Sequence, residues 1–322
     1  MLPRPLLTST FALSYRKIPV LAIGREIYCD TSLIIEALEN FFPASQGWGT
    51  VYPKFEGLDE WTYKGLVRGF ASFWTDKPLF RSTTGLIPSR VWSSSFGTDR
   101  AQLIGHALDP SKLASKIPQN LANLDLHLSL LEPTFSKPGA WAVPTKTPSL
   151  ADISLYYQLR WGVDIAAGRG VYDLSGGGTG DAEEDVVGEV FNEGRYPGLW
   201  AWFHAFETYI STLPDPQTTV PSSSTTWIET LRQTPLLADE QLLVPTAVEQ
   251  HPSLDKQRGL VKGVSVSVAP DDTGRDNPTV GTLVKIGVEE VIIQPSEKAE
   301  LDVRVHFPRL GFVVKVVEGA KL

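Results

Sequence analysis

Asp30 and Thr31 are the neighbouring residues whose types and position best suit binding chemistry in this sequence. They stand where a β-rich stretch gives way to a helical one, so they would open a helix. The N–H groups of a helix N-terminus and the Thr31 hydroxyl suit a carboxylate, and the Asp30 carboxylate suits an ammonium group. The alternative is that Asp30 only caps the helix, which is the commoner role of aspartate at this position.

The residues around this pair indicate a hairpin followed by a helix. Apolar residues within 18–23 form a first short run, Gly24 supplies a turn residue, and the run resumes at 27–29. After Asp30, apolar residues recur on one helical face, at Leu33, Ile34, Ala37, Leu38 and Phe41. Pro19 has no N–H group to donate to a neighbouring strand. The first strand is therefore expected at the edge of a sheet, or with its Pro19 side facing something other than a paired strand. A cis bond there would turn the preceding amide outward; the alternative is that Pro19 only ends the strand.

Composition narrows the class of protein. The 322 residues are 42% hydrophobic, which is enough for more than one core, and the length favours two domains. The net charge of −8 argues against nucleic acid or anionic membrane as the main partner. No apolar run approaches the roughly 18 residues of a membrane span, and residues 1–13 do not read as a secretory signal. Cys29 is the single cysteine and lies in an apolar run, so we expect a buried side chain and a reducing, cytoplasmic compartment.

Helical patterns dominate the middle of the chain. A linker rich in proline, glycine and serine over 42–57 precedes them, and apolar residues recur at helical spacing over 113–131. A further helix is indicated over 147–161, where Ser149 and Asp152 stand three apart as in a capping box. We assign these two residues to folding, and we expect loss of Asp152 to cost about 1 kcal/mol or more of stability.

Three other polar features of the sequence do not indicate a metal site or a phosphate site. His127 lies beside the leucine stripe, with no second His or Cys at metal spacing. The glycine cluster within 174–185 is not a phosphate loop, because no Lys-Ser or Lys-Thr follows it. Asp271, Asp272 and Asp276 lie in turn chemistry without a glutamate at the far end of the loop, so a solvated turn is favoured over calcium. No metal site is therefore predicted.

After about residue 242 the apolar residues no longer recur at helical spacing; instead, apolar and polar residues alternate. Short strands are predicted over 260–269, 280–286, 290–293, 301–307 and 312–317. Four or five short strands separated by turn residues indicate a small antiparallel sheet or barrel.

The stretch KIPVLAIG…YCDTSLIIEALE resembles the second half of the thioredoxin-like domain of glutathione S-transferases. In that family the residue before a cis-proline offers its backbone to the cysteinyl part of glutathione. An acidic residue followed by Ser or Thr opens the next helix and holds the γ-glutamyl end. The resemblance therefore implies a glutathione site that is formed by Ile18, Pro19, Asp30 and Thr31.

The resemblance extends beyond this stretch. The Ala151–Asp152 pair is similar to the capping box that opens the central helix of the family's all-helical domain, and fungal members with an added C-terminal β domain look similar overall. The family places a strand–helix–strand unit before the proline hairpin, with the hydroxyl or thiol that activates glutathione. Only fourteen residues precede Tyr15, so this N-terminal half is expected to be missing, through truncation or through loss of the activity. Tyr15 and Tyr28 are the nearby hydroxyls, and neither is assigned a catalytic role.

The expected fold class is α+β and multidomain. A partial thioredoxin-like domain is predicted over 1–42, an all-helical domain over 55–235 and a small β-rich domain over 242–322. Two functions stay open. One is a glutathione transferase-like enzyme that uses glutathione as co-substrate and transfers its thiolate to a small apolar electrophile, held by aromatic helices over 58–80. The other is a non-catalytic module of the same fold that binds a partner or forms a homodimer. Retention on immobilised glutathione would test the site.

Overall fold

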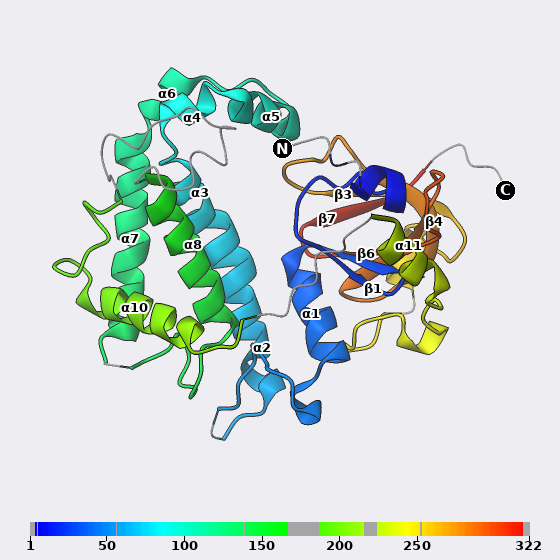
Figure 1. Ribbon diagram of the computed structural model, residues 1–322, viewed down its shortest axis with the longest axis horizontal. Coiled ribbons are helices and arrows are strands. Elements are labelled where there is room, and N and C mark those ends of the chain that lie inside the picture. The colour runs from blue at the N-terminus through cyan, green and yellow to red at the C-terminus, as the bar shows by residue number, and fades with distance from the viewer. Residues whose placement is uncertain are drawn as a thin grey trace. The chain divides into compact units, whose positions relative to one another are not determined.

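The chain divides into two units in this computed structural model (Figure 1). The structure describes residues 4, 6–55, 57–137, 139–166, 187–215, 224–251 and 253–317. Unit 1 comprises Met1–Gly49, Leu103–Gly105 and Thr218–Leu322, and unit 2 comprises Thr50–Gln102 and His106–Gln217. The glycine cluster within 174–185 lies outside the described residues.

A mixed sheet forms the centre of unit 1. Its strands are β1 (Val20–Ile23), β2 (Glu26–Cys29), β3 (Ser265–Pro270), β4 (Thr279–Ile286), β5 (Glu290–Pro295), β6 (Arg304–Pro308) and β7 (Phe312–Val316). The order across the sheet is β1-β2-β6-β5-β4-β3-β7, and every neighbouring pair is antiparallel except β2 and β6, which run parallel. The hairpin is confirmed, and the sheet joins it to the C-terminal strands, although the sequence analysis assigned 1–42 and 242–322 to separate domains.

Both faces of this sheet are covered around β2, β5 and β6. Alternate residues of these strands, such as Ile27, Val305 and Ile293, enter one apolar cluster together with side chains from Leu7 to Tyr15. On the opposite face, Tyr28 packs with residues of helix α1 (Thr31–Phe41) and with Val244. Because both faces are buried, apolar residues stand next to one another in β2 and β5, at Ile27–Cys29 and Val291–Ile293.

Shorter helices complete unit 1. They are η1 (Leu6–Thr10), η2 (Ala44–Gln46), α11 (Ser224–Gln233), η4 (Asp239–Gln241) and α12 (Leu254–Gln257). The segment between α11 and α12 runs past the ends of β2 and β5, where backbone amides of Leu237 and Val244 donate hydrogen bonds to Glu26 and Glu290.

The described part of unit 2 is helical. Its helices are α2 (Glu60–Gly69), η3 (Phe70–Leu79), α3 (Phe80–Thr84), α4 (Ser89–Trp92), α5 (Ser95–Ile104), α6 (Pro110–Ala114), α7 (Ile117–Phe135), α8 (Leu150–Ala166) and α10 (Pro197–Ser211). The apolar repeat over 113–131 is divided between α6 and α7. Pro118 stands in the first turn of α7, where a proline is tolerated but a continuing helix is not.

Asp152 ties three parts of unit 2 together. Its carboxylate accepts hydrogen bonds from the Ser149 amide and hydroxyl, both at 2.9 Å, from the Ala142 amide at 2.7 Å and from Trp202 Nε1 at 3.0 Å. The side chain is fully buried. Burial raises the pKa of the Asp152 carboxyl above its ordinary value, although these hydrogen bonds act in the opposite direction. The predicted pairing of Ser149 with Asp152 at the start of α8 is therefore present, and the aspartate also anchors the start of the 142–149 loop and helix α10.

Candidate functional site

The hairpin brings the four residues of the expected site to one end of β1 and β2. Val20 pairs with Cys29, so the next residues outward on the two strands are Pro19 and Asp30. The Ile18–Pro19 peptide bond is cis. Ile18 is 63% exposed, Pro19 and Thr31 are exposed, and Asp30 is half-buried. Four predicted residues therefore form one accessible edge at the N-terminus of α1.

Asp30 has an unusual backbone conformation. Its φ of 70° and ψ of 136° lie in a region that side chains other than glycine rarely adopt, at a cost of about 1–3 kcal/mol. The Asp30 carboxylate accepts hydrogen bonds from the Ser32 amide at 3.1 Å and the Ser32 hydroxyl at 2.6 Å. The first turn of α1 and this cap hold the conformation in place. Such outliers persist where the surroundings over-determine them, and they cluster at ligand sites.

The thiol and phenols nearest to this edge are poorly suited to activate a thiol. The Tyr15 hydroxyl lies 3.5 Å from Asp30 Oδ2, and burial, reinforced by the Asp30 charge, raises the pKa of Tyr15 well above its ordinary value. Burial also raises the pKa values of Cys29 and of Tyr28. All three side chains are buried, so none presents its hydroxyl or thiol to a ligand at this edge, and Tyr15 and Tyr28 are left without a catalytic role.

An open apolar cavity of about 600 Å³ lies within unit 2. Two glycines of α2, Gly65 and Gly69, lie one turn apart on its wall, and a Cβ atom added to either would meet open space. Aromatic side chains of η3 form another part of the lining, namely Phe70, Phe73 and Trp74. The helix η3 is a π-helix, a rare form that recurs at functional sites. The cavity volume and apolar lining are those of a small-molecule pocket.

Residues of α7 and of the loop that follows it line a further part of this cavity. They are Leu130, Leu131, Thr134, Phe135, Ala142 and Val143. His127 of α7 accepts a hydrogen bond from Trp74 Nε1 at 3.3 Å, and burial lowers the pKa of the His127 imidazole. The histidine is therefore a neutral partner that orients a cavity-lining tryptophan. The sequence signal for this cavity is a pair of glycines four residues apart, followed by aromatic residues.

No group of His, Cys, Asp and Glu side chains in the described ranges is arranged to hold a metal ion. In the turn between β3 and β4, both carboxylate oxygens of Asp272 accept hydrogen bonds from Lys17 Nζ, at 2.7 and 2.9 Å. As far as the described helices go, none has both the length and the apolar character that crossing a bilayer requires.

The chain is similar in structure to a GST-like protein from Pseudomonas syringae. The two share 24% sequence identity with a TM-score of 0.56, and the match covers 98% of this chain and 87% of that one. At this identity the likeness concerns the fold, so the chain has a glutathione S-transferase-like α+β fold. A family described as a domain of unknown function (DUF7962) matches residues 83–171. No curated protein matches the chain.

Proposed function

We propose that this protein is a glutathione transferase-like enzyme that binds glutathione at Ile18, Pro19, Asp30 and Thr31. The observation that carries the proposal is Asp30, which is held at a positive φ of 70° at the N-terminus of α1, opposite the exposed Pro19. In this pose the Asp30 carboxylate would pair with the γ-glutamyl ammonium group, and Thr31 would hold the carboxylate beside it. The backbone of Ile18 would bind the cysteinyl part of the tripeptide.

The second substrate in this proposal is a small apolar electrophile. The cavity in unit 2 supports this choice because glycines and aromatic side chains line it, and such a surface favours flat apolar molecules. Transfer would form a bond from the glutathione sulfur to the electrophilic carbon after the thiol has lost its proton to solvent; the bond from that carbon to its leaving group breaks, and the leaving group departs with the electron pair.

The glutathione site can be tested with Asp30→Asn. Asparagine still accepts a hydrogen bond from the Ser32 amide and tolerates a positive φ, so the helix cap should survive while the charge is lost. We expect the Kd for glutathione to rise by about tenfold or more, since a hydrogen bond to a charged group contributes about 1.5–3 kcal/mol. Isothermal titration calorimetry with glutathione would measure this change.

A matched control is Asp59→Asn. Asp59 caps α2 through the amides of Trp61 and Thr62, as Asp30 caps α1, but it belongs to unit 2. Its substitution should leave the Kd for glutathione unchanged. Equal affinity of Asp30→Asn and the native chain, or no binding of glutathione by the native chain, would contradict the proposed site.

The apolar cavity can be tested with Gly65→Leu. The leucine side chain would enter the open space beside Gly65 and fill part of the cavity, so we expect much weaker binding of the apolar fluorophore 1-anilinonaphthalene-8-sulfonate. The control Gly65→Ala adds one methyl group and should keep binding, while it raises helix stability by about 0.5–1 kcal/mol. Fluorescence titration and thermal unfolding measure the two effects. Unchanged fluorophore binding by Gly65→Leu would rule out this cavity as the apolar site.

A non-catalytic glutathione-fold module is the second candidate. The specific observation in its favour is that the side chains of Tyr15, Tyr28 and Cys29 are buried, so none of the three is presented at the accessible edge where glutathione would bind. Under this alternative the chain would bind a protein partner or form a homodimer. Glutathione binding that is sensitive to Asp30→Asn, without consumption of an added electrophile, would favour it over the enzyme.

A further inference from the structure

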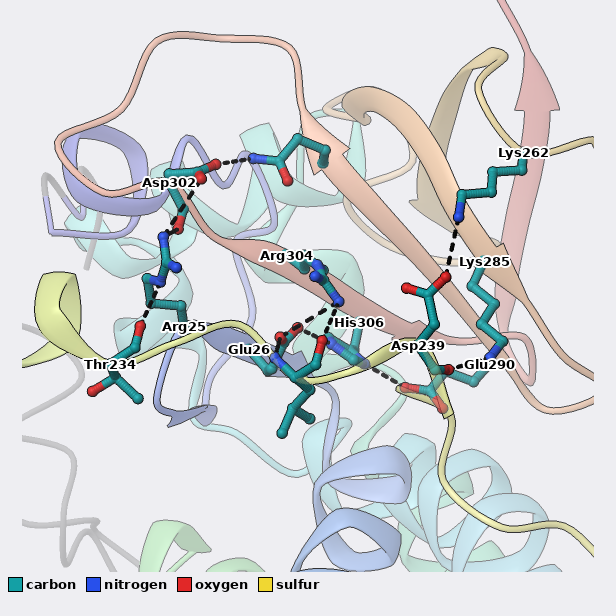
Figure 2. Close-up of polar contacts among 12 residues, drawn as sticks. Arg25, Glu26, Thr234, Asp239, Lys262, Lys285, Glu290, Asp302, Arg304 and His306 are labelled. Carbon is teal, nitrogen blue, oxygen red and sulfur yellow. Dashed lines mark hydrogen bonds and ion pairs between the residues drawn. The ribbon is translucent and has the colours of Figure 1, made fainter. Parts of the chain in front are cut away.

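Three buried charged side chains meet on one face of the sheet in unit 1 (Figure 2). The His306 imidazole lies between two carboxylates: Nδ1 is 2.6 Å from Glu290 Oε1, and Nε2 is 2.9 Å from Glu26 Oε2. None of the three side chains is more than a few per cent exposed. We call this group, formed by Glu26, Glu290 and His306, the carboxylate–histidine cluster.

The strand register explains how the cluster forms. His306 of β6 is opposite Tyr28 of β2 and Ile292 of β5, and Glu26 and Glu290 lie two residues away on those two strands. Residues two apart on a strand share a face, so all three side chains project from the same side of the sheet. The cluster therefore joins the N-terminal hairpin to strands about 280 residues later in the chain.

The outer oxygens of both carboxylates hold the segment 234–244. Glu26 Oε1 accepts a hydrogen bond from the Leu237 amide at 2.9 Å, and Glu290 Oε2 accepts one from the Val244 amide at 2.8 Å. Arg304 donates to the Leu237 carbonyl at 3.1 Å and lies 3.8 Å from Glu26 Oε1. The two carboxylates that bind His306 thus also fix this segment against the sheet, together with Arg304.

Charge balance decides the protonation state of the histidine. Two buried carboxylates are costly without cations, and with a proton on both ring nitrogens His306 donates a hydrogen bond to each of them. Burial by itself would lower the pKa of His306, but the hydrogen bonds to Glu26 and Glu290 outweigh it and raise that pKa above its ordinary value. The imidazolium is therefore the form that the native state favours.

Besides Arg304, few charged or titratable groups among the described residues lie around the cluster. The Tyr28 ring lies 4.3 Å from the imidazole between centroids, and burial raises the pKa of its hydroxyl. Helix α1, which packs on this face, carries the buried Glu36, which has interactions of its own. At the edge of the segment, Asp239 pairs with Lys262 at 3.2 Å, and Lys285 donates to the Asp239 carbonyl (Figure 2).

We propose that the carboxylate–histidine cluster is a pH-sensitive latch: protonated His306 holds β2, β5 and the segment 234–244 together, and its deprotonation loosens them. The sign follows from the direction of the pKa change. A histidine whose pKa is higher in the folded than in the unfolded chain stabilises fully below about pH 6.5 and loses its contribution as pH rises through the folded pKa. Unit 1 therefore opens more readily as the solution becomes alkaline.

Cys29 provides a built-in reporter of this opening. Its side chain is fully buried on β2, in the cluster on the opposite sheet face from His306, so it reacts with iodoacetamide only when the sheet opens. The labelling rate is divided by that of the same variant unfolded in urea at the same pH, which cancels the ionisation of the thiol. We expect the normalised rate of the native chain to rise by up to tenfold per pH unit above about pH 6.5 and to level off where folded His306 loses its proton. Nuclear magnetic resonance of ring-labelled histidine locates that step.

Three variants separate a latch from a merely structural cluster. His306→Gln should label faster at neutral pH and lose the rise. Glu290→Gln removes one carboxylate from the imidazole and so lowers the folded pKa of His306; the rise should therefore be smaller and level off at lower pH. This variant carries the test if His306→Gln does not fold. The control His251→Gln replaces an exposed histidine of unit 1 and should behave as the native chain. A flat native profile between about pH 6.5 and the measured titration of His306, or an upper end of the rise that Glu290→Gln does not move, would overturn the proposal.

Discussion

Replacing Asp152 with alanine is expected to lower the free energy of unfolding of unit 2 by about 3–5 kcal/mol. The carboxylate accepts four hydrogen bonds from three residues, Ala142, Ser149 and Trp202. Alanine would leave these donors in a buried site without an acceptor, and each buried unsatisfied group costs about 1–3 kcal/mol. The expected loss of stability is smaller than the summed cost of the four lost hydrogen bonds, because loop 142–149 can move so that its amides reach water.

Hydrogen exchange of peptides from α8 and α10 would measure this loss within unit 2. Both helices should exchange faster in Asp152→Ala, because the carboxylate contacts the start of one and Trp202 of the other. Asp59→Ala is the control: it also removes an aspartate cap, but from an exposed helix start, and its effect should be much smaller and confined to α2. Equal protection of α8 in Asp152→Ala and the native chain would refute the role given to this carboxylate.

The second large effect is expected for Phe206→Ala. The Phe206 ring is 2% exposed, stacks on Tyr156 at 4.4 Å between centroids and meets the edge of Trp141 at 6.2 Å. Removing it leaves a cavity that the surrounding aromatic rings of α8 and α10 are too stiff to fill. The expected loss in the free energy of unfolding is about 3–5 kcal/mol.

Urea unfolding, followed by hydrogen exchange of unit 2 peptides, checks this expectation. Phe80→Ala serves as the comparison, because Phe80 is also stacked on an aromatic ring, that of Trp161, but is 49% exposed. That substitution should cost far less. A loss for Phe206→Ala no larger than that for Phe80→Ala would show that the aromatic cluster does not govern the stability of this unit.

Local signals in the sequence predicted the hairpin, helix α1 and the capping box at Asp152. Each of these features depends on residues within about ten positions of one another, so periodicity and cap chemistry suffice. The pairing of β2 with β6 depends on residues nearly the whole chain apart, and nothing in either strand specifies the other. For the same reason the carboxylate–histidine cluster could not be predicted from Glu26, Glu290 and His306 separately.

The candidate site divides in the same way. The position of Asp30 at a helix start, and of Pro19 in the strand before it, follows from residue types and order. The positive φ of Asp30 does not, because glycine is the residue that signals such a conformation. The cavity in unit 2 depends on how η3 packs against α7, which a helical period cannot predict.

The parallel pairing of β2 with β6 can form only late in the synthesis of the chain. Because β6 follows β2 by about 280 residues, at about 5–20 residues per second the ribosome needs on the order of tens of seconds to supply it. During that interval one backbone edge of β2 has no partner strand, while the helices of unit 2 can already form from local contacts. A nascent chain is therefore most exposed to edge-to-edge association before β6 emerges, which is where assistance by a chaperone would matter most.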